Sequence, residues 1–214
     1  MKEIEKYVAE HSSAEPEILQ EVTRQSNLRV VNPRMLSGHI QGRLLAMLTS
    51  MVAPKRVLEL GTFTAYSTIS MALAMEKGSE LVTIEKDDEL EDMAAEFIEK
   101  AGVRDIVKQE IGAALDVMER LEGTFDMVFI DADKRQYLEY YNLLFEKNLL
   151  SLNCLIIADN TLWDGKVVEE TDRRDSQTLG IKAFNAFVAQ DPRVEKVMLP
   201  LRDGLTLIRV KDNF

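Results

Sequence analysis

The chain is poor in several residue types, and each shortage narrows what the protein can be. It has one cysteine among 214 residues, so no internal disulfide can form and a reducing compartment fits. That residue, Cys154, stands in the apolar run 152–158, which predicts a buried structural thiol. The two histidines, His11 and His39, lack the spacing of a zinc site or of a Ser-His-Asp triad, so we assign neither a catalytic role.

Basic residues and long apolar runs are scarce as well. The 26 Lys and Arg residues are outnumbered by 37 Asp and Glu, giving a formal net charge of −11 that argues against nucleic acid or an anionic membrane surface as a partner. No segment approaches the roughly 18 apolar residues of a membrane span. The first six residues lack the apolar stretch and small-residue cleavage site of a signal peptide. We therefore expect a cytoplasmic protein.

The length and the apolar content predict one domain. A chain of 214 residues that is 46% hydrophobic can bury a sizeable core. Residues 1–52 are predicted to form a helical amino-terminal extension with three helices. The first covers 1–10, the second begins at the segment 13–16, and the third has one apolar face. That face carries Ile40, Leu44, Leu45, Leu48 and Val52.

Residues 53–214 are predicted to form a Rossmann-like core. Short β-rich runs alternate there with helical stretches, which indicates βαβ units and a parallel sheet. We expect strands over 57–60, 81–85, 106–110, 127–131 and 154–158, with helices near 66–76, 89–101, 113–121, 135–147 and 176–190.

The end of the chain breaks this alternation. Two further apolar runs, 195–201 and 205–210, flank the turn sequence Arg202-Asp-Gly204, which is typical of a β-hairpin. The predicted fold class is therefore α/β: a doubly wound, mostly parallel seven-stranded sheet with an antiparallel C-terminal hairpin. This order resembles the sheet plan of class I S-adenosylmethionine-dependent methyltransferases and is unlike the all-parallel dinucleotide-binding sheet.

Two predicted strands end abruptly in oxygen-bearing side chains. Asp131 ends one run, and Asp159 with Asn160 ends the next. If these are neighbouring parallel strands, about 4.8 Å apart, three hard oxygen donors meet at one edge of the sheet. Such donors suit Mg²⁺, Ca²⁺ or Mn²⁺. Capping of helices by the same side chains is the alternative explanation.

The first strand-to-helix turn suggests a small nucleoside-containing ligand. The turn 59–67 does not match G-x-G-x-x-G, which disfavours a pyrophosphate held against the backbone. Gly61 would let a ligand approach closely, and Ser67 with the free amides of the next helix could hold a carboxylate such as that of methionine. Glu85, 24 residues after Gly61, could accept hydrogen bonds from a ribose. An ordinary tight turn and a solvated helix start are the respective alternatives.

Lys134 and Trp163 follow the oxygen donors closely in sequence. A divalent charge near Lys134 would disfavour its ammonium form and leave a neutral amine able to deprotonate a hydroxyl. A solvated turn is the alternative for this residue. Trp163 could form an aromatic wall over a planar substrate or simply pack its loop.

Taken together, these motifs resemble the cation-dependent catechol and caffeoyl-coenzyme A O-methyltransferases, including their small bacterial relatives. The similarity spans most of the chain, over 58–67, 83–85, 125–134, 158–166 and 191–206, and its most specific parts are Asp-Ala-Asp-Lys at 131–134 and Asp-Asn-Thr-Leu-Trp at 159–163. One departure is Ala65, which stands where the family's turn usually has glycine, so we expect the local backbone to differ. The plant enzymes also have longer substrate-binding segments than this chain.

The resemblance implies roles for individual residues. Asp131, Asp159 and Asn160 would bind the cation, Lys134 would act as the base, and Ser37 would lie near that site with its hydroxyl. The residues implied for the methyl donor are Glu59, Gly61 and Ser67 at the methionine end, Glu85 at the ribose, and Ala114 and Asp133 near the adenine.

The function expected from the sequence is methyl transfer from S-adenosylmethionine to one hydroxyl of a catechol-like aromatic, with a divalent cation, most readily Mg²⁺, holding both vicinal oxygens. The resemblance also suggests a homodimer built partly through the amino-terminal helices. An NAD-dependent oxidoreductase is the first rival, favoured by Glu85 but opposed by the missing glycine fingerprint and the terminal hairpin. A donor-binding protein without turnover is the second.

Overall fold

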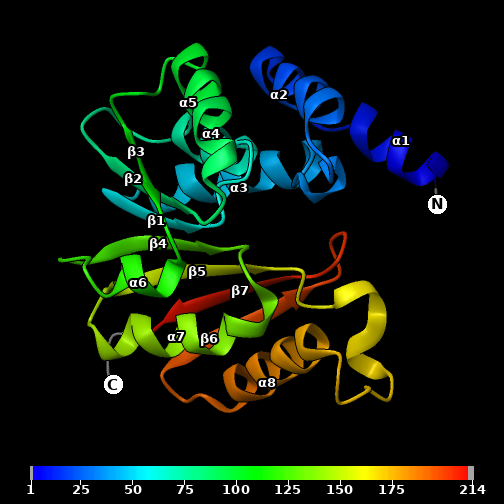
Figure 1. The fold of residues 1–214 in the computed structure, drawn as a ribbon, viewed down its shortest axis with the longest axis vertical. Helices are drawn as coiled ribbons and strands as arrows, with labels where there is room; N and C mark the ends of the chain where they lie inside the picture. The colour runs from blue at the N-terminus through cyan, green and yellow to red at the C-terminus, as the bar shows by residue number, and fades with distance from the viewer. Residues whose placement is uncertain (1, 212–214) are drawn as a thin grey trace.

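A seven-stranded mixed sheet forms the centre of the computed structural model, which describes residues 2–211 (Figure 1). The strand order is β3-β2-β1-β4-β5-β7-β6. Five strands are parallel, and β7 runs antiparallel to both β5 and β6. The strands are β1 Arg56–Leu60, β2 Glu80–Glu85, β3 Val107–Ile111, β4 Phe125–Ile130, β5 Leu150–Asp159, β6 Val194–Leu199 and β7 Leu205–Val210.

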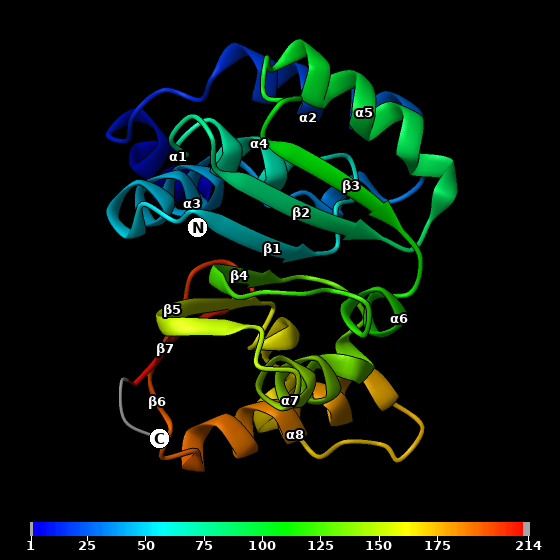
Figure 2. The ribbon, with the colours of Figure 1, turned by 90° about the vertical axis from the view of Figure 1, so that its left-hand side faces the viewer.

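Helices cover both faces of this sheet (Figure 2). The helices on one face are α2 Glu17–Arg29, α3 His39–Val52, α4 Tyr66–Ala72 and α5 Glu91–Lys100. Those on the other face are α6 Ala114–Met118, α7 Tyr137–Glu146 and α8 Ser176–Gln190. Short 3-10 turns lie at Pro33–Met35 (η1), Asp88–Leu90 (η2), Lys134–Gln136 (η3) and Trp163–Val168 (η4).

The inner strands β1, β2 and β4 are largely apolar on both faces because each face is covered. Along β1, Val57 belongs to the core beneath α2 to α5, while Leu58 belongs to the core beneath α6 to α8. Strands buried on both sides lose the alternation of apolar and polar residues. The near-continuous apolar runs in the sequence are thereby explained.

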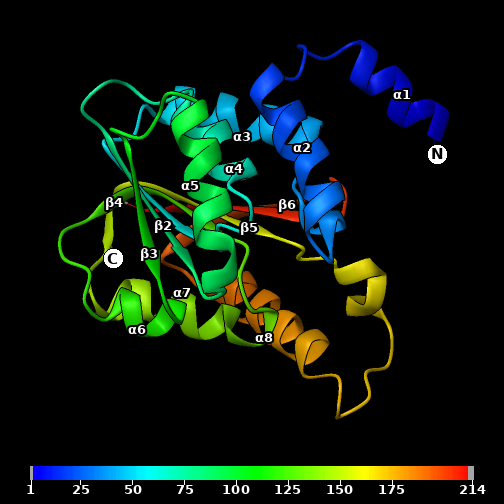
Figure 3. The ribbon, with the colours of Figure 1, turned by 45° about the horizontal axis from the view of Figure 1, so that its top comes forward.

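Helix α1 (Lys2–Glu10) lies apart from this two-layered body. It projects beyond α2 and α3 (Figure 3). Its side chains Ile4, Tyr7 and Val8 are exposed, although all three are apolar or aromatic. The amino-terminal extension therefore contains two helices that cover the sheet and one that extends from it.

The predicted fold class is confirmed, with shifts at the element ends. Strand β5 begins at Leu150 rather than Cys154, because its first residues pair with β4 before a shift in register. Helix α4 ends at Ala72, four residues earlier than expected. Cys154 is a buried free thiol, as predicted. Within residues 2–211, every helix is too short or too polar to traverse a bilayer.

Candidate active site

A cavity of about 1350 Å³ opens at the carboxyl edge of strands β1, β2, β4 and β5. It is larger than the usual site for one small ligand, so it has room for two small ligands together. Eleven of the twelve residues singled out from the sequence line it: Ser37, Gly61, Ser67, Glu85, Ala114, Asp131, Asp133, Lys134, Asp159, Asn160 and Trp163. The twelfth, Glu59, is fully buried.

Gly61 allows the turns after β1 and β4 to approach each other. Its φ is +100°, and a Cβ built on it would lie 2.3 Å from the carbonyl oxygen of Asp131. The amide of Asp131 donates to the carbonyl of Leu60 at 2.8 Å, which holds the two turns together. A side chain at position 61 would separate them, so glycine is required here.

Glu59 organises the first turn from below the cavity. Its carboxylate accepts hydrogen bonds from the hydroxyls of Ser67 at 2.5 Å and Thr83 at 2.6 Å, and a third from the hydroxyl of Thr68. The hydroxyls of Thr62 and Thr83 also share a hydrogen bond of 2.6 Å. Ser67, at the start of α4, is thus fixed by a fully buried carboxylate while it lines the cavity.

Burial has a second consequence for Glu59. Removal from water raises its pKa to about 7, against the lowering effect of the three hydroxyl donors. The folded protein therefore holds a proton that the unfolded chain releases above about pH 4.5. The contribution of this proton to the free energy of unfolding is complete below that pH and is lost as the pH rises through about 7, the pKa of Glu59 in the folded protein.

We expect Glu59→Gln to remove this pH dependence. The wild-type free energy of unfolding should fall between pH 4.5 and pH 7 by about 3 kcal/mol at most from this residue, at about 1.4 kcal/mol per pH unit. Urea unfolding at pH 5 and pH 8 measures the loss. Because Asp159 titrates in an overlapping range, the comparison is between the variant and the wild type. Equal losses in the two proteins would contradict the prediction.

Glu85 and Asp133 lie on the wall formed by β2 and η3. The Glu85 carboxylate accepts from the amides of Phe63 at 2.7 Å, Lys86 at 2.8 Å and Asp87 at 2.9 Å. It therefore joins the first turn to the end of β2 and also caps the chain that follows. Asp133 pairs with the Arg135 guanidinium, which lowers the pKa of that carboxyl.

Lys134 is buried on the cavity wall, so the alternative of a solvated turn is wrong. Only 9% of the residue is exposed. Its Nζ donates to Asp131 Oδ1 at 2.6 Å and to the Tyr137 hydroxyl at 2.9 Å. Burial, followed by the charges of Asp131 and Asp159, raises the pKa of Tyr137 well above its usual value. The tyrosine therefore stays protonated and positions the amine.

Asp159 and Asn160 stand opposite, at the end of β5. Gln41 Nε2 of α3 donates to Asp159 Oδ2 at 2.5 Å, and the backbone N–H of Asn160 donates to Asp159 Oδ1 at 2.7 Å. Desolvation and the charge of Asp131 raise the pKa of Asp159 to about 6. Asn160 donates through Nδ2 to Asp203 at 3.3 Å, which leaves its side-chain oxygen available as a ligand.

The remaining predicted residues lie around this centre. Ser37 is 5% exposed and lines the cavity beside η1. Trp163 lines the cavity and also packs against the core beneath α6 to α8, so it packs its loop, and its role as a wall over a substrate stays a prediction. Ala65 has a φ of +65° at the start of α4, so the turn keeps a glycine-like backbone despite its Cβ.

Three contributors were not identified from the sequence. Gln41 binds Asp159 from 118 residues away, Tyr137 holds Lys134, and Asp203 holds Asn160. Gln41 lies four residues before Leu45 on the apolar face of α3, and both are buried. A polar side chain on such a face was an available signal, because buried polar groups require partners.

Comparisons with known proteins identify the family of this chain. Residues 9–211 match the family described as O-methyltransferase. Tricin synthase 2 from Oryza sativa subsp. japonica is 39% identical over 186 residues, which cover 82% of this chain but only 63% of that protein. The catechol O-methyltransferase of Niastella koreensis is 37% identical over 180 residues, covering 80% of each chain. The O-methyltransferase TomG from Streptomyces achromogenes, solved in complex with SAM, has a TM-score of 0.89 at 29% identity and covers 98% of this chain and 96% of its own.

The resemblance seen in the motifs is therefore confirmed at the level of the family. The match runs across nearly all of the helices and strands, and the solved relative carries the same fold over its whole length. The chain belongs to the O-methyltransferase family, and it is an O-methyltransferase with the class I S-adenosylmethionine-dependent fold.

Proposed function

We propose that this enzyme transfers a methyl group from S-adenosylmethionine to one hydroxyl of a catechol-like aromatic, with the help of a divalent cation. The observation that carries the proposal is the presence of Asp131, Asp159, Asn160 and Lys134 on the wall of one cavity. The names of the relatives support the chemistry, since one is a catechol O-methyltransferase and another was solved with SAM.

The donor set fits a hard cation. Asp131 and Asp159 interact through their charges in a largely buried site, and the Asn160 oxygen has no hydrogen-bond partner among residues 2–211. Two carboxylates and an amide oxygen suit Mg²⁺, Ca²⁺ or Mn²⁺. No group of three or more histidine, cysteine or acidic side chains is arranged for a metal in the described chain, and the proposed set accordingly has two carboxylates and one carboxamide. A bound cation would supply charge that favours the ionised acceptor hydroxyl.

Lys134 would take the proton from that hydroxyl as a neutral amine, the form that a nearby divalent cation would favour. Its amine lies on the cavity wall, and its contacts with Asp131 and Tyr137 fix its position. The resulting phenolate oxygen attacks the methyl carbon, and the carbon–sulfur bond breaks with its electrons passing to sulfur. Both charges diminish in this step, so alignment of the two reactants should supply much of the rate enhancement.

For the donor, the first turn provides the binding surface. Gly61 leaves space beside the backbone, Ser67 presents its hydroxyl, and Glu85 would meet the ribose. Ala114 and Asp133 lie along the same wall and would flank the adenine. Glu59 would act through Ser67, since its carboxylate is fully buried and holds that hydroxyl.

The proposal predicts sensitivity to chelators. With labelled S-adenosylmethionine and a panel of vicinal diphenols, methylation should require added Mg²⁺ and fall to background in excess EDTA. Monophenols should not be methylated, because they offer the cation only one oxygen. Methylation of every active diphenol at full rate in EDTA would show that the transfer needs no metal.

We further propose that the enzyme is a cytoplasmic homodimer. The exposed apolar side chains of α1 and of α3, among them Ile4, Tyr7, Met47 and Met51, support an interface on this side of the molecule. Light scattering on the purified protein measures its molar mass, and the mass of a single chain of 24.3 kDa would refute the dimer.

A further inference from the structure

Arg202 holds a backbone conformation that side chains disfavour. It lies in the turn between β6 and β7 with a φ of +51°, in the left-handed region. A residue other than glycine is unfavourable there, and such residues concentrate at functional sites. The neighbouring Gly204, with a φ of +88°, already supplies the flexibility that the hairpin needs. The arginine is therefore not explained by the turn alone.

Its side chain reaches across to the opposite wall of the cavity. Nη1 donates to the carbonyl oxygen of Leu36 at 2.9 Å and lies 3.2 Å from where a Cβ of Gly38 would stand. These two residues flank Ser37. Arg202 lines the cavity, and within residues 2–211 no carboxylate lies at ion-pair distance from it. Most of its five N–H donors thus remain available to a ligand.

The turn that carries Arg202 lies against the proposed cation ligands. The amide of Leu162 donates to the carbonyl of Asp203 at 2.8 Å, and the Asn160 side chain donates to the Asp203 carboxylate at 3.3 Å. Glu85 and Ala114, which are assigned to the donor nucleoside, follow β2 and β3 toward one side of the sheet, whereas the turn between β6 and β7 lies toward the other side. Arg202 therefore borders the acceptor end of the cavity.

The acceptor end of the cavity is rich in acidic side chains, so an arginine there would change which acceptors can bind. Asp131, Asp159 and Asp203 all line the cavity, and the chain carries a net charge of −11. A bound divalent cation would neutralise Asp131 and Asp159, but Asp203 and the net charge of the chain would still repel an anionic acceptor. A guanidinium offers two parallel N–H donors that match a carboxylate, and its charge offsets the repulsion. Among the other cations lining the cavity, Arg135 pairs with Asp133, Arg29 with Glu96 and Lys134 with Asp131. Lys86 follows β2 at the donor end, and Arg34 lies in η1, so neither is carried by the turn that contacts the proposed cation ligands.

We propose that Arg202 is a specificity-determining residue that binds a carboxylate on the acceptor, so that the preferred substrates are vicinal dihydroxy aromatics bearing an acidic group. The inference rests on the proposed function and extends it to the substrate class. The competing explanation is that Arg202 only ties the hairpin to Leu36. That role would affect acidic and neutral acceptors equally.

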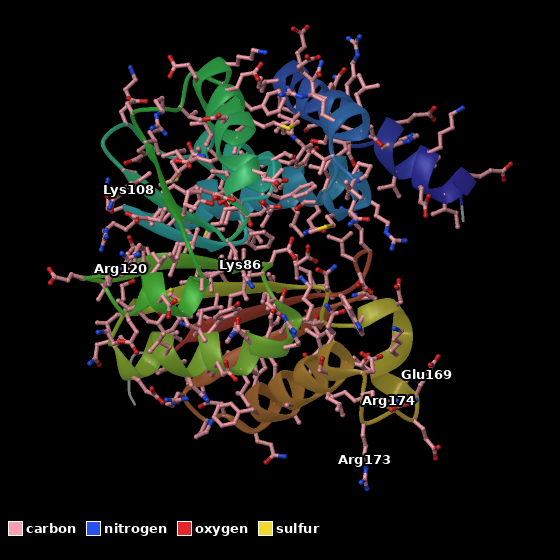
Figure 4. The ribbon with its side chains drawn as sticks, in the orientation of Figure 1. Lys86, Lys108, Arg120, Glu169, Arg173 and Arg174 are labelled. Atoms are coloured by element: carbon pink, nitrogen blue, oxygen red, sulfur yellow. The ribbon has the colours of Figure 1, made fainter. Side chains whose placement is uncertain are left out.

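The test compares matched acceptors. For 3,4-dihydroxycinnamate and its methyl ester, kcat/KM is measured for the wild type, Arg202→Gln and Arg202→Lys. Arg120→Gln is the control, since Arg120 is an exposed cation at the opposite end of the sheet, before β4 (Figure 4). The Arg120→Gln variant loses the same positive charge as Arg202→Gln, but residue 120 does not line the cavity.

In the wild type, the acid should be preferred over the ester. Arg202→Gln should lower the acid-to-ester ratio by about tenfold, mainly through the KM of the acid, while kcat/KM for the ester stays within about twofold. Arg202→Lys should retain part of the preference, and Arg120→Gln all of it. An unchanged ratio in Arg202→Gln, or an equal loss with both acceptors, would overturn the inference alone. Failure of the wild type to methylate any diphenol would overturn the proposed function and the inference with it.

Discussion

Asp159→Asn is expected to lower kcat/KM for methylation at least about 100-fold, the scale of loss seen when a metal site is disturbed. The substitution removes one of the two carboxylates of the proposed cation site and leaves an amide of nearly the same shape. Gln41 can still contact the new side chain, so the local packing should survive. The measurement is a Mg²⁺ titration of the rate. Full activity with an unchanged Mg²⁺ requirement would remove Asp159 from the cation site.

Stability in metal-free buffer separates loss of the site from loss of the fold. The Asp159 side chain is largely buried and interacts unfavourably with the charge of Asp131. Replacing it with a neutral amide should therefore leave the free energy of unfolding unchanged or higher when no cation is present. An inactive variant with a markedly lower melting temperature would mean that Asp159 holds the structure together instead.

Gly61→Ala should produce the largest loss of stability of any glycine-to-alanine substitution among the described residues. The new Cβ would lie 2.3 Å from the carbonyl oxygen of Asp131 and 2.8 Å from its carbonyl carbon. Both are backbone atoms and cannot move aside without separating β1 from β4. We expect a decrease of about 3 kcal/mol or more in the free energy of unfolding, together with weaker binding of S-adenosylmethionine. Urea denaturation and calorimetric titration measure the two effects.

Gly78→Ala is the matched control for this substitution. Gly78 has a φ of +85°, close to that of Gly61, but nothing lies within 4 Å of a Cβ built there. The conformational cost alone should be about 1–2 kcal/mol, with no effect on donor binding. Equal losses in the two variants would mean that backbone conformation, and not the approach to Asp131, explains the requirement for glycine at position 61.

The inner strands of this fold could be predicted because most of their residues are apolar on both faces. The runs 127–130 and 155–158 are short and wholly apolar, which favours a buried strand. The acidic residues that follow mark where each strand ends. The first four residues of β5, Leu150 to Asn153, are half polar and were not predicted. They join the sheet through pairing between Phe125 and Leu150, which depends on the neighbouring strand and not on their own composition.

The proposed cation ligands could be predicted by the same reasoning, but the residues that hydrogen-bond to them could not. Asp131 and Asp159 follow neighbouring strands, so sheet topology alone brings them to one edge. Gln41 and Asp203 reach the same place from a helix before the sheet and from a turn after it. Their partners depend on how α3 and the β6–β7 turn pack. The left-handed backbone of Arg202 is likewise a product of the folded turn.

The position of β7 has a consequence for the order in which the protein can mature on the ribosome. This strand is the last of the seven to be synthesised, yet it lies between β5 and β6. Until it emerges, β5 is an edge strand with exposed apolar residues, a known hazard for aggregation. Asp203 also reaches Asn160 only once the hairpin closes. A nascent chain stalled after residue 199 should therefore be prone to aggregate and unable to methylate, and full-length release should restore both solubility and turnover.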